Sequence, residues 1–214
     1  MEKHNYLCGA LVERAYAEAG ARHPKAKEAD RAARRELHRV AGAFFSREET
    51  KRAEKLLAAW PEGGDEALSR ILSLHASTRE RLPLAAMDAL YAQLFKMTGK
   101  PRRVLDLACG LNPVYLAARG ISVLGLDAHL GAVALVNRFA EENGLDARAE
   151  GYALLERLNA AWAAVSFPTR TLSGRSVGME RNYSSAFEEN CPQRFAIADR
   201  FVAGNELIYI LKER

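Results

Sequence analysis

The chain has 214 residues, of which 49% are hydrophobic and 27% charged, as in one large or two modest globular domains. No apolar run approaches the roughly 18 residues needed to span a bilayer, and the mixed-charge N-terminus lacks the apolar core of a signal peptide. We therefore expect a cytoplasmic protein without a membrane segment. The widely spaced Cys8, Cys109 and Cys191 predict neither a disulfide framework nor a zinc site, and we expect no metal.

The net charge of +4 is concentrated near the N-terminus. Residues 1–60 hold 13 Lys/Arg against 9 Asp/Glu, which accounts for the whole surplus. Between Arg22 and Arg39 there are seven basic residues and three acidic ones. A basic segment on an otherwise neutral chain indicates a polyanionic partner, most simply nucleic acid. The same residues also fall on helical spacings, so an ordinary solvated helix face with ion pairs remains open.

The first 97 residues read as helices, because their apolar residues recur at helical spacing. Ser46 and Glu49 form a capping box that opens one helix. Asp65 is placed to cap the next helix, expected over residues 67–75. A further helix is expected over residues 83–97, between a proline and Gly99-Lys-Pro.

After Pro101 the pattern changes to alternating strands and helices. The last two strands follow each other closely, which predicts a closing hairpin on an otherwise parallel sheet. The expected strands are Arg103–Ala108, Ile121–Leu126, Trp162–Phe167, Arg194–Phe201 and Glu206–Leu211, and the expected helices lie near Pro113–Arg119, Leu130–Asn143, Ala153–Asn159 and Met179–Asn190.

The stretch Asp106-Leu-Ala-Cys-Gly110 follows the first strand, and Asp127 ends the second. A glycine lets backbone approach a ligand closely, and an acid at the end of the second strand can accept hydrogen bonds from both ribose hydroxyls. The G-x-G-x-x-G pattern that cradles a pyrophosphate is absent. The layout favours a nucleoside without phosphates, most commonly S-adenosylmethionine, over a dinucleotide. Any α/β protein can also carry such a turn.

The expected fold is α/β: a class I (Rossmann-like) S-adenosylmethionine-dependent methyltransferase with an N-terminal all-helical domain. Such a sheet needs two strands more than the five expected here. Strands three and four should lie between Asp146 and Trp162, but the 15 residues there leave no room for a strand–helix crossover of about 30 residues. Either the protein has lost these central strands, or the sequence omits a disordered segment. We hypothesise the second, with one or more strand–helix units missing between about Ala147 and Ala153.

Two further segments carry groups suited to binding. Residues 75–83 place His75, two hydroxyls and Arg81 before a helix, and arginine suits bidentate recognition of a carboxylate. Residues 166–179 form a basic, glycine-containing segment after a strand, with Arg170 and Arg175, that could clamp a phosphate backbone or cover a flipped base. A simple helix cap and a simple connection remain the alternatives.

Together these segments resemble the aminoglycoside-resistance 16S ribosomal RNA (guanine-N7) methyltransferases of the Arm/Rmt type. The resemblance covers most of the chain and implies methyl transfer from S-adenosylmethionine to N7 of one guanosine in the decoding site of the assembled 30S subunit, which confers aminoglycoside resistance. It is carried by His-Ala-Ser-Thr-Arg-Glu-Arg-Leu (75–82), Arg-Val-Leu-Asp-Leu-Ala-Cys-Gly-Leu-Asn-Pro (103–113), Val-Ser-Phe-Pro-Thr-Arg (165–170), Gly-Arg-Ser-Val-Gly-Met-Glu-Arg-Asn-Tyr (174–183) and Gly-Asn-Glu-Leu-Ile-Tyr (204–209).

The resemblance implies a cofactor site without a catalytic acid or base. N7 of guanine has a free lone pair, so catalysis reduces to proximity and orientation. By resemblance, Arg81 binds the methionine carboxylate and Asp127 the ribose hydroxyls. The other residues expected at the cofactor are His75, Asp106, Ala108, Gly110 and Asn112.

The resemblance also implies an RNA-binding surface and a monomeric enzyme acting on 16S rRNA within the 30S subunit. Arg170 and Arg175, with Met179 in the same segment, are expected to hold RNA near the flipped guanosine. Residues 1–76 form the expected docking domain and residues 77–214 the methyltransferase domain. The expected docking residues are Arg31, Arg34, Arg35, Lys51 and Arg52.

The chain departs from the family at the place where strands are missing. The acidic motif after strand three, which contacts the adenine side of the cofactor, and the Lys-containing motif of strand four are both absent. Two other interpretations therefore remain: a small-molecule methyltransferase whose basic N-terminal domain is a lid, and a non-catalytic RNA-binding relic of the fold.

Overall fold

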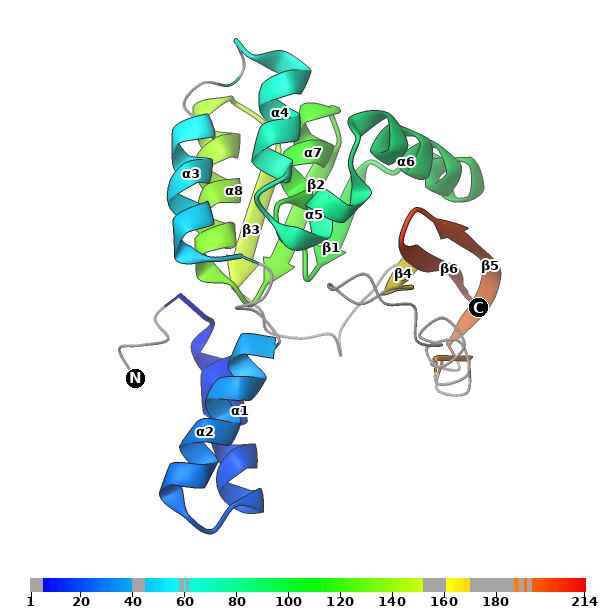
Figure 1. The fold of residues 1–214 in the computed structure, drawn as a ribbon. Helices are drawn as coiled ribbons and strands as arrows, with labels where there is room; N and C mark the ends of the chain where they lie inside the picture. Colours follow the sequence, from blue (N-terminus) through cyan, green and yellow to red (C-terminus); the bar gives the residue numbers. More distant parts are fainter. Residues whose placement is uncertain are drawn as a thin grey trace. The chain divides into compact units, whose positions relative to one another are not determined.

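The computed structural model describes residues 6–39, 45–57, 60, 62–151, 161–169, 187–188, 191 and 194–214. Contacts between residues divide the chain into two compact units (Figure 1). Unit 1 comprises Met1–Leu82 and Pro101–Leu154, and unit 2 comprises Pro83–Lys100 and Leu155–Arg214. The expected division into a docking domain (residues 1–76) and a methyltransferase domain (residues 77–214) concerns function and remains a proposal.

Unit 1 contains a parallel sheet of three strands in the order β1-β2-β3. The strands are β1 (Arg103–Leu107), β2 (Ser122–Asp127) and β3 (Ala147–Gly151), and the helices between them are α7 (Asn112–Ala118) and α8 (Leu130–Glu142). Asp106 of β1 pairs with Gly125 of β2, so the carboxyl ends of both strands meet at one edge of the sheet. The predicted α/β fold is confirmed, and its first two strands agree with the prediction within one residue at each end.

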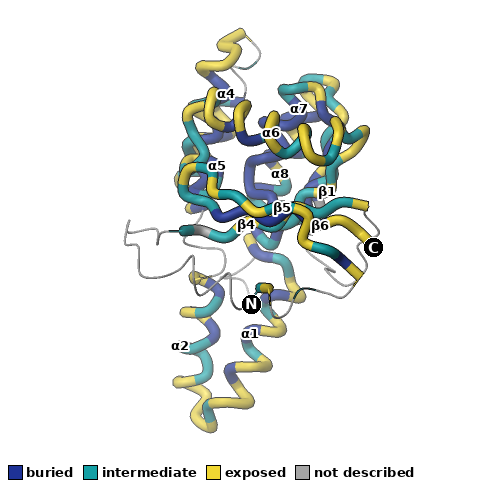
Figure 2. Tube along the Cα trace, turned by 90° about the vertical axis from the view of Figure 1, so that its right-hand side faces the viewer, coloured by how far each residue is buried: buried dark blue, intermediate teal, exposed yellow. Residues whose placement is uncertain are grey.

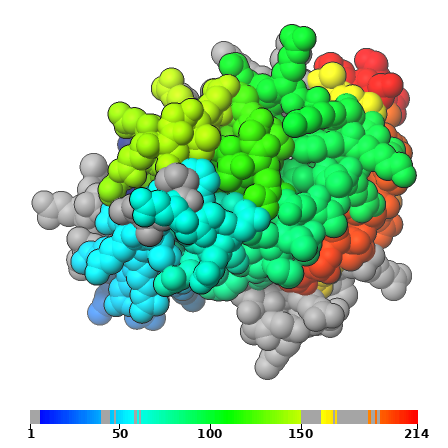
Figure 3. All heavy atoms as spheres, turned by 90° about the horizontal axis from the view of Figure 1, so that it is seen from above, coloured from blue at the N-terminus to red at the C-terminus, as the bar shows by residue number. Residues whose placement is uncertain are grey.

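Three helices from the N-terminal half belong to the same unit: α3 (Arg47–Leu57), α4 (Gly64–Leu72) and α5 (Ala76–Arg81). Helix α3 packs beside α8, as the cyan and yellow-green spheres of Figure 3 show, and α4 contacts α7. The capping box is confirmed, because Ser46 N–H donates to Glu49 Oε2 at 2.7 Å and Glu49 N–H donates to Ser46 Oγ at 3.2 Å. The predicted cap at Asp65 is wrong: α4 begins one residue earlier, and Asp65 pairs instead with Arg119 at 2.8 Å.

Helices α1 (Gly9–Arg22) and α2 (Ala26–Leu37) form an antiparallel pair, named here the α1–α2 hairpin. Its facing sides are buried and its outer sides are mostly exposed (Figure 2). The pattern follows from the sequence, since small and apolar residues recur every three or four positions among charged ones. The buried cluster consists of Leu7, Leu11, Ala15 and Leu37.

Unit 2 contains an antiparallel sheet of three strands in the order β4-β6-β5, with β6 at its centre. The strands β5 and β6 form the predicted closing hairpin. Leu90 packs with Ile208 and Ile210 of β6. The elements are α6 (Leu84–Thr98), which carries Leu90, with β4 (Trp162–Pro168), β5 (Phe195–Ala203) and β6 (Glu206–Glu213).

One strand of the expected sheet is absent from the described residues. Doubly wound sheets place the fourth strand beside the first. Among the described residues, β1 pairs only with β2, so no described strand pairs with the other edge of β1. The omission of β3 from the prediction was wrong, since residues 147–151 do form strand three. The helices expected over 153–159 and 179–190 fall outside the described residues except at positions 187–188.

Candidate functional site

The turn after β1 has an unusual backbone. Ala108 and Gly110 both have positive φ, 53° and 51°. A non-glycine residue in this region is uncommon, and such residues cluster at functional turns. The turn is tied to the neighbouring strand, because Cys109 N–H donates to Leu126 C=O at 3.1 Å. The sheet therefore holds an exposed Ala108 at the carboxyl end of β1.

The Asp127 carboxylate connects the two strand ends. Its Oδ2 accepts a hydrogen bond from Gly110 N–H and its Oδ1 accepts one from His129 N–H, each at 2.8 Å. The residue is 9% exposed. An ionised carboxylate has about four lone-pair sites, so two remain after these bonds. The acid can still accept hydrogen bonds from hydroxyl groups of a ligand.

The His75 ring lies directly against Gly110. A Cβ placed on Gly110 would lie 2.5 Å from the nearest ring atom of His75, closer than any side chain tolerates. Ser77 Oγ lies 2.9 Å from His75 Nδ1. The glycine predicted for close approach is therefore required for two reasons, its positive φ and the histidine beside it.

Burial controls the ionisation of this cluster. The pKa of His75 is lowered to about 4, chiefly by burial and also by the charges of His129 and Arg81, while Asp127 and Glu49 oppose the shift. Burial raises the pKa of the Cys109 thiol well above its usual range. At neutral pH the histidine is uncharged and the cysteine remains a thiol, so neither forms a charged nucleophile.

Asp106 and Asn112 close the other side of the turn. Asn112 Nδ2 donates to Asp106 Oδ2 at 2.6 Å, and Asn112 is buried at the start of α7. Arg81 is half-buried at the end of α5. The structure thus gathers all seven residues predicted at the cofactor within unit 1.

Two residues of this cluster were not selected from the sequence. The Phe45 ring is 1% exposed and lies 5.5 Å from the His75 ring and 5.3 Å from the His129 ring, measured between ring centroids. His129 caps α8, because its Nδ1 accepts a hydrogen bond from Ala132 N–H at 3.3 Å. Its position two residues after Asp127 was the only sequence signal for it.

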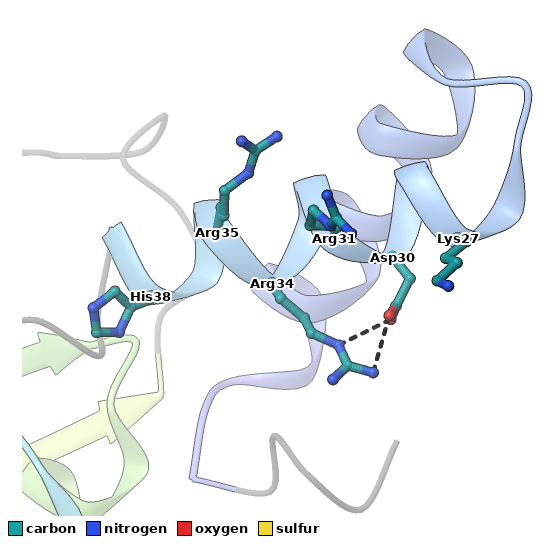
Figure 4. A pocket seen from close by; sticks show the side chains of 6 residues that line it. All are labelled: Lys27, Asp30, Arg31, Arg34, Arg35 and His38. Carbon is teal, nitrogen blue, oxygen red and sulfur yellow. Dashed lines mark hydrogen bonds and ion pairs between the residues drawn. The ribbon is translucent and has the colours of Figure 1, made fainter.

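Helix α2 presents a row of cations on its outer face (Figure 4). Arg34 pairs with Asp30 at 3.0 Å, so the ion-pair interpretation holds for that residue. Arg31 and Arg35 are exposed and have no carboxylate partner among the described residues. Lys51 and Arg52 are exposed on α3. A hollow of about 450 Å³ on α2 is lined by Lys27, Asp30, Arg31, Arg34, Arg35 and His38.

The predicted RNA-binding residues Arg170, Arg175 and Met179 lie outside the described residues. The residue before them is firmly held within unit 2. Thr169 N–H donates to Asn205 C=O at 2.8 Å, and Thr169 Oγ1 donates to Asn205 Oδ1 at 2.9 Å. Asn205, which the sequence supplied only as part of a motif, thereby fixes where this segment leaves β4.

The polar groups at this site fit the ribose and amino-acid parts of S-adenosylmethionine. A carboxylate with two remaining acceptor sites suits the ribose, and Arg81 suits a carboxylate group. No metal-binding group of histidine, cysteine or acidic residues occurs in the described part of the chain. Within the same residues, every helix is too short or too polar to cross a membrane.

A parallel sheet with a one-glycine turn after its first strand and an acid after its second is typical of class I S-adenosylmethionine-dependent methyltransferases, and the solved structures that this chain matches are methyltransferases. The chain matches the model of the family described as ribosomal RNA methyltransferase (FmrO) over residues 7–141 and 127–210. It belongs to this family.

Characterised relatives match over nearly the whole chain. The 16S rRNA (guanine(1405)-N(7))-methyltransferase of Serratia marcescens is 39% identical over 245 residues, which cover 99% of this chain and 94% of the relative. The structure of the 16S rRNA methyltransferase RmtF in complex with S-adenosyl-L-homocysteine matches with a TM-score of 0.88 and 38% identity, covering 98% of this chain and 92% of RmtF. The 16S rRNA methylase RmtB matches with a TM-score of 0.82 and 35% identity, covering 100% and 94%.

The length of the alignment agrees with the missing strand. The match to the Serratia protein extends over 245 residues, whereas this chain has 214, a difference of 31. The family match is also split into two segments that overlap at residues 127–141, shortly before β3. One strand–helix unit takes roughly 30 residues, so the difference in length corresponds to about one such unit.

Proposed function

We propose that this chain transfers a methyl group from S-adenosylmethionine to N7 of a guanosine in the decoding site of 16S rRNA, in the assembled 30S subunit, and thereby confers aminoglycoside resistance. In this proposal it acts as a cytoplasmic monomer. The observation that carries the proposal is the cluster of Asp127, Gly110, His75 and Arg81 at the carboxyl ends of β1 and β2 in a chain of this family.

The chemistry requires little of the protein beyond placement. When bound, S-adenosylmethionine supplies an electrophilic methyl group on a sulfonium. The N7 lone pair of guanine is unprotonated at neutral pH, so no general base is needed. Arg81 would bind the amino-acid carboxylate and Asp127 the ribose hydroxyls, while the turn at Ala108 and Gly110 lets the backbone approach. The protein's contribution is proximity, alignment and exclusion of water.

The basic face of α2 supports docking on RNA. Lys27, Arg31, Arg34, Arg35 and His38 follow one another at helical spacing on the side away from the buried Ala33 and Leu37. Cations so arranged can contact successive phosphates and position the protein without reading base sequence. In the proposal Lys51 and Arg52 extend this surface, and Arg170, Arg175 and Met179 lie near the target base.

The test is a methylation assay with tritiated S-adenosylmethionine on purified 30S subunits and, in parallel, on free 16S rRNA. We expect label on 30S subunits alone, mapped by primer extension to a single decoding-site guanosine. Asp127→Asn should lose the label, whereas Asp146→Asn, an exposed acid outside the cluster, should keep it. Label on a small molecule without ribosomes would favour the small-molecule methyltransferase instead.

The missing strand favours one second candidate, an RNA-binding protein that no longer methylates. Among the described residues no strand pairs with the other edge of β1, where the resemblance implies the strand that carries the family's Lys-containing motif. Binding of 30S subunits without binding of S-adenosylhomocysteine in calorimetry would establish this candidate. Binding of both would leave the methyltransferase.

A further inference from the structure

The α1–α2 hairpin is attached at its N-terminal end to the residues that follow Asp127. Cys8 N–H donates to Ala128 C=O at 2.8 Å, and Leu130 N–H donates to Tyr6 C=O at 2.8 Å. The two bonds form a short antiparallel pairing between the segment before α1 and the segment after β2. The entrance to the hairpin therefore cannot shift without moving the residues next to the acid.

Side-chain packing strengthens this attachment. Ala128, the residue immediately after Asp127, packs against the buried cluster of the hairpin. The Tyr6 ring contacts the His129 ring at 5.4 Å between centroids. The chain directly after β2 thus forms part of the hairpin's own core.

The segment that follows the hairpin reaches the same place. The Phe45 ring contacts both His75 and His129, at 5.5 Å and 5.3 Å. The His129 side chain is also hydrogen-bonded to the backbone of Phe45. Residues on both sides of the hairpin in the sequence therefore meet at His129.

His129 links these contacts to the acid through its own backbone. Its N–H donates to Asp127 Oδ1 at 2.8 Å, while its ring Nδ1 accepts from Ala132 N–H. Because Nδ1 accepts a hydrogen bond, the proton of the neutral ring lies on Nε2. One residue thus bonds the carboxylate, the start of α8 and the chain that follows the hairpin.

We propose that His129 is a positioning residue that couples docking of the α1–α2 hairpin on RNA to the orientation of the Asp127 carboxylate. The inference rests on the proposed function. In this proposal, RNA bound to the cations of α2 shifts the hairpin, and the contacts of Tyr6 and Phe45 pass that shift to the His129 ring. His129 N–H in turn holds the Asp127 carboxylate. By linkage, docking on the 30S subunit and binding of the cofactor then change each other's affinity by the same factor.

The test compares His129→Asn with wild type. Asparagine keeps a side-chain acceptor that can cap α8, and the backbone N–H to Asp127 is unaffected. It removes the ring contacts to Tyr6 and Phe45. His23→Asn, at the end of α1, is the matched control for the same change within the hairpin. Affinity for tritiated S-adenosylhomocysteine is measured for each protein by ultrafiltration, alone and with saturating 30S subunits.

We expect the wild type and His23→Asn to bind S-adenosylhomocysteine at least about 5-fold more tightly with 30S subunits than without, the lower end of usual coupling between sites. His129→Asn should bind both partners with that ratio reduced toward one. A wild-type ratio of one, or an unchanged ratio in His129→Asn, would overturn the coupling. If the wild type binds neither S-adenosylhomocysteine by itself nor 30S subunits by themselves, the proposed function is overturned, and this proposal with it.

Hydrogen exchange on the wild type keeps the proposal testable if His129→Asn does not fold. Addition of 30S subunits without cofactor should slow exchange of the amides over residues 128–132. Unchanged exchange there, with slowed exchange on α2, would show docking that does not reach the acid and would overturn the coupling.

Discussion

Substitution of Gly110 by alanine tests the geometry of the site most directly. The backbone at Gly110 has φ +51°, and a left-handed conformation costs an L-residue about 1–2 kcal/mol. The new Cβ would also lie 2.5–2.9 Å from three ring atoms of His75. Ordinary carbon contacts are about 3.5–4.0 Å, so the buried ring must move by about 1 Å. Overpacking of this kind costs about 1–3 kcal/mol more, giving a total of about 2–5 kcal/mol.

Gly144→Ala supplies the matched control. Gly144 has φ +60°, and a Cβ there meets nothing within 4 Å. It should therefore show only the backbone cost of about 1–2 kcal/mol. The free energy of unfolding, from urea titrations, measures both losses, and calorimetry with S-adenosylhomocysteine measures the effect on the site. Only Gly110→Ala should weaken ligand binding.

A double variant identifies the source of the extra cost. If the His75 ring causes it, Gly110→Ala in a His75→Ala background should lose no more stability than Gly144→Ala does. Equal losses for the two glycine variants, or a loss at Gly110 that is independent of His75, would refute the steric reasoning.

Three further predictions concern charge. Asp127→Asn should weaken S-adenosylhomocysteine binding about 10–100-fold, since hydrogen bonds to charged groups contribute about 1.5–3 kcal/mol. Asp146→Asn should bind as the wild type does. Equal affinities of the two variants in calorimetry would exclude Asp127 from the site. Arg31→Ala should lower the slope of log affinity for 30S subunits against log salt by about 1, and Arg138→Ala on α8 should leave it unchanged. The pKa of His75 lies at about 4, below its ordinary value of 6.5, so its contribution to stability should be complete above pH 6.5 and fall by about 3 kcal/mol as the pH drops to about 4. Urea titrations at several pH values should show a smaller fall in His75→Asn, and parallel curves for the two proteins would contradict the shift.

The sequence predicted the elements whose signals lie within a few neighbouring residues. Strands β1, β2, β4, β5 and β6 were found because their apolar runs are bounded by turn residues. The Ser46–Glu49 capping box was predicted because both partners lie within one turn. Strand β3 was missed because Ala-Arg-Ala-Glu-Gly has no apolar run, and its Ala149 is buried under neighbours that the local sequence does not reveal.

The sequence predicted which residues lie in the candidate site better than it predicted which of them touch one another. The turn and the acid follow from spacing along two adjacent strands. The contact of Phe45 with His75 and His129 brings together residues that lie 30 and 84 positions apart in the sequence, and periodicity cannot predict it. The two backbone partners of Asp127 were equally hidden, because they depend on how both turns close.

The order of the strands in unit 2 has a consequence for synthesis on the ribosome. Strand β6 is made after β4 and β5, yet it occupies the centre of their sheet and packs against α6. Ile208 emerges 118 residues after Leu90, which takes roughly 6–24 s at about 5–20 residues per second. During that interval β4 and β5 lack the strand that joins them, and the apolar side of α6 lacks its partner. Unit 2 therefore cannot complete its folding before β6 leaves the ribosome, and until then the nascent chain exposes apolar surface of α6, β4 and β5 to chaperones and proteases.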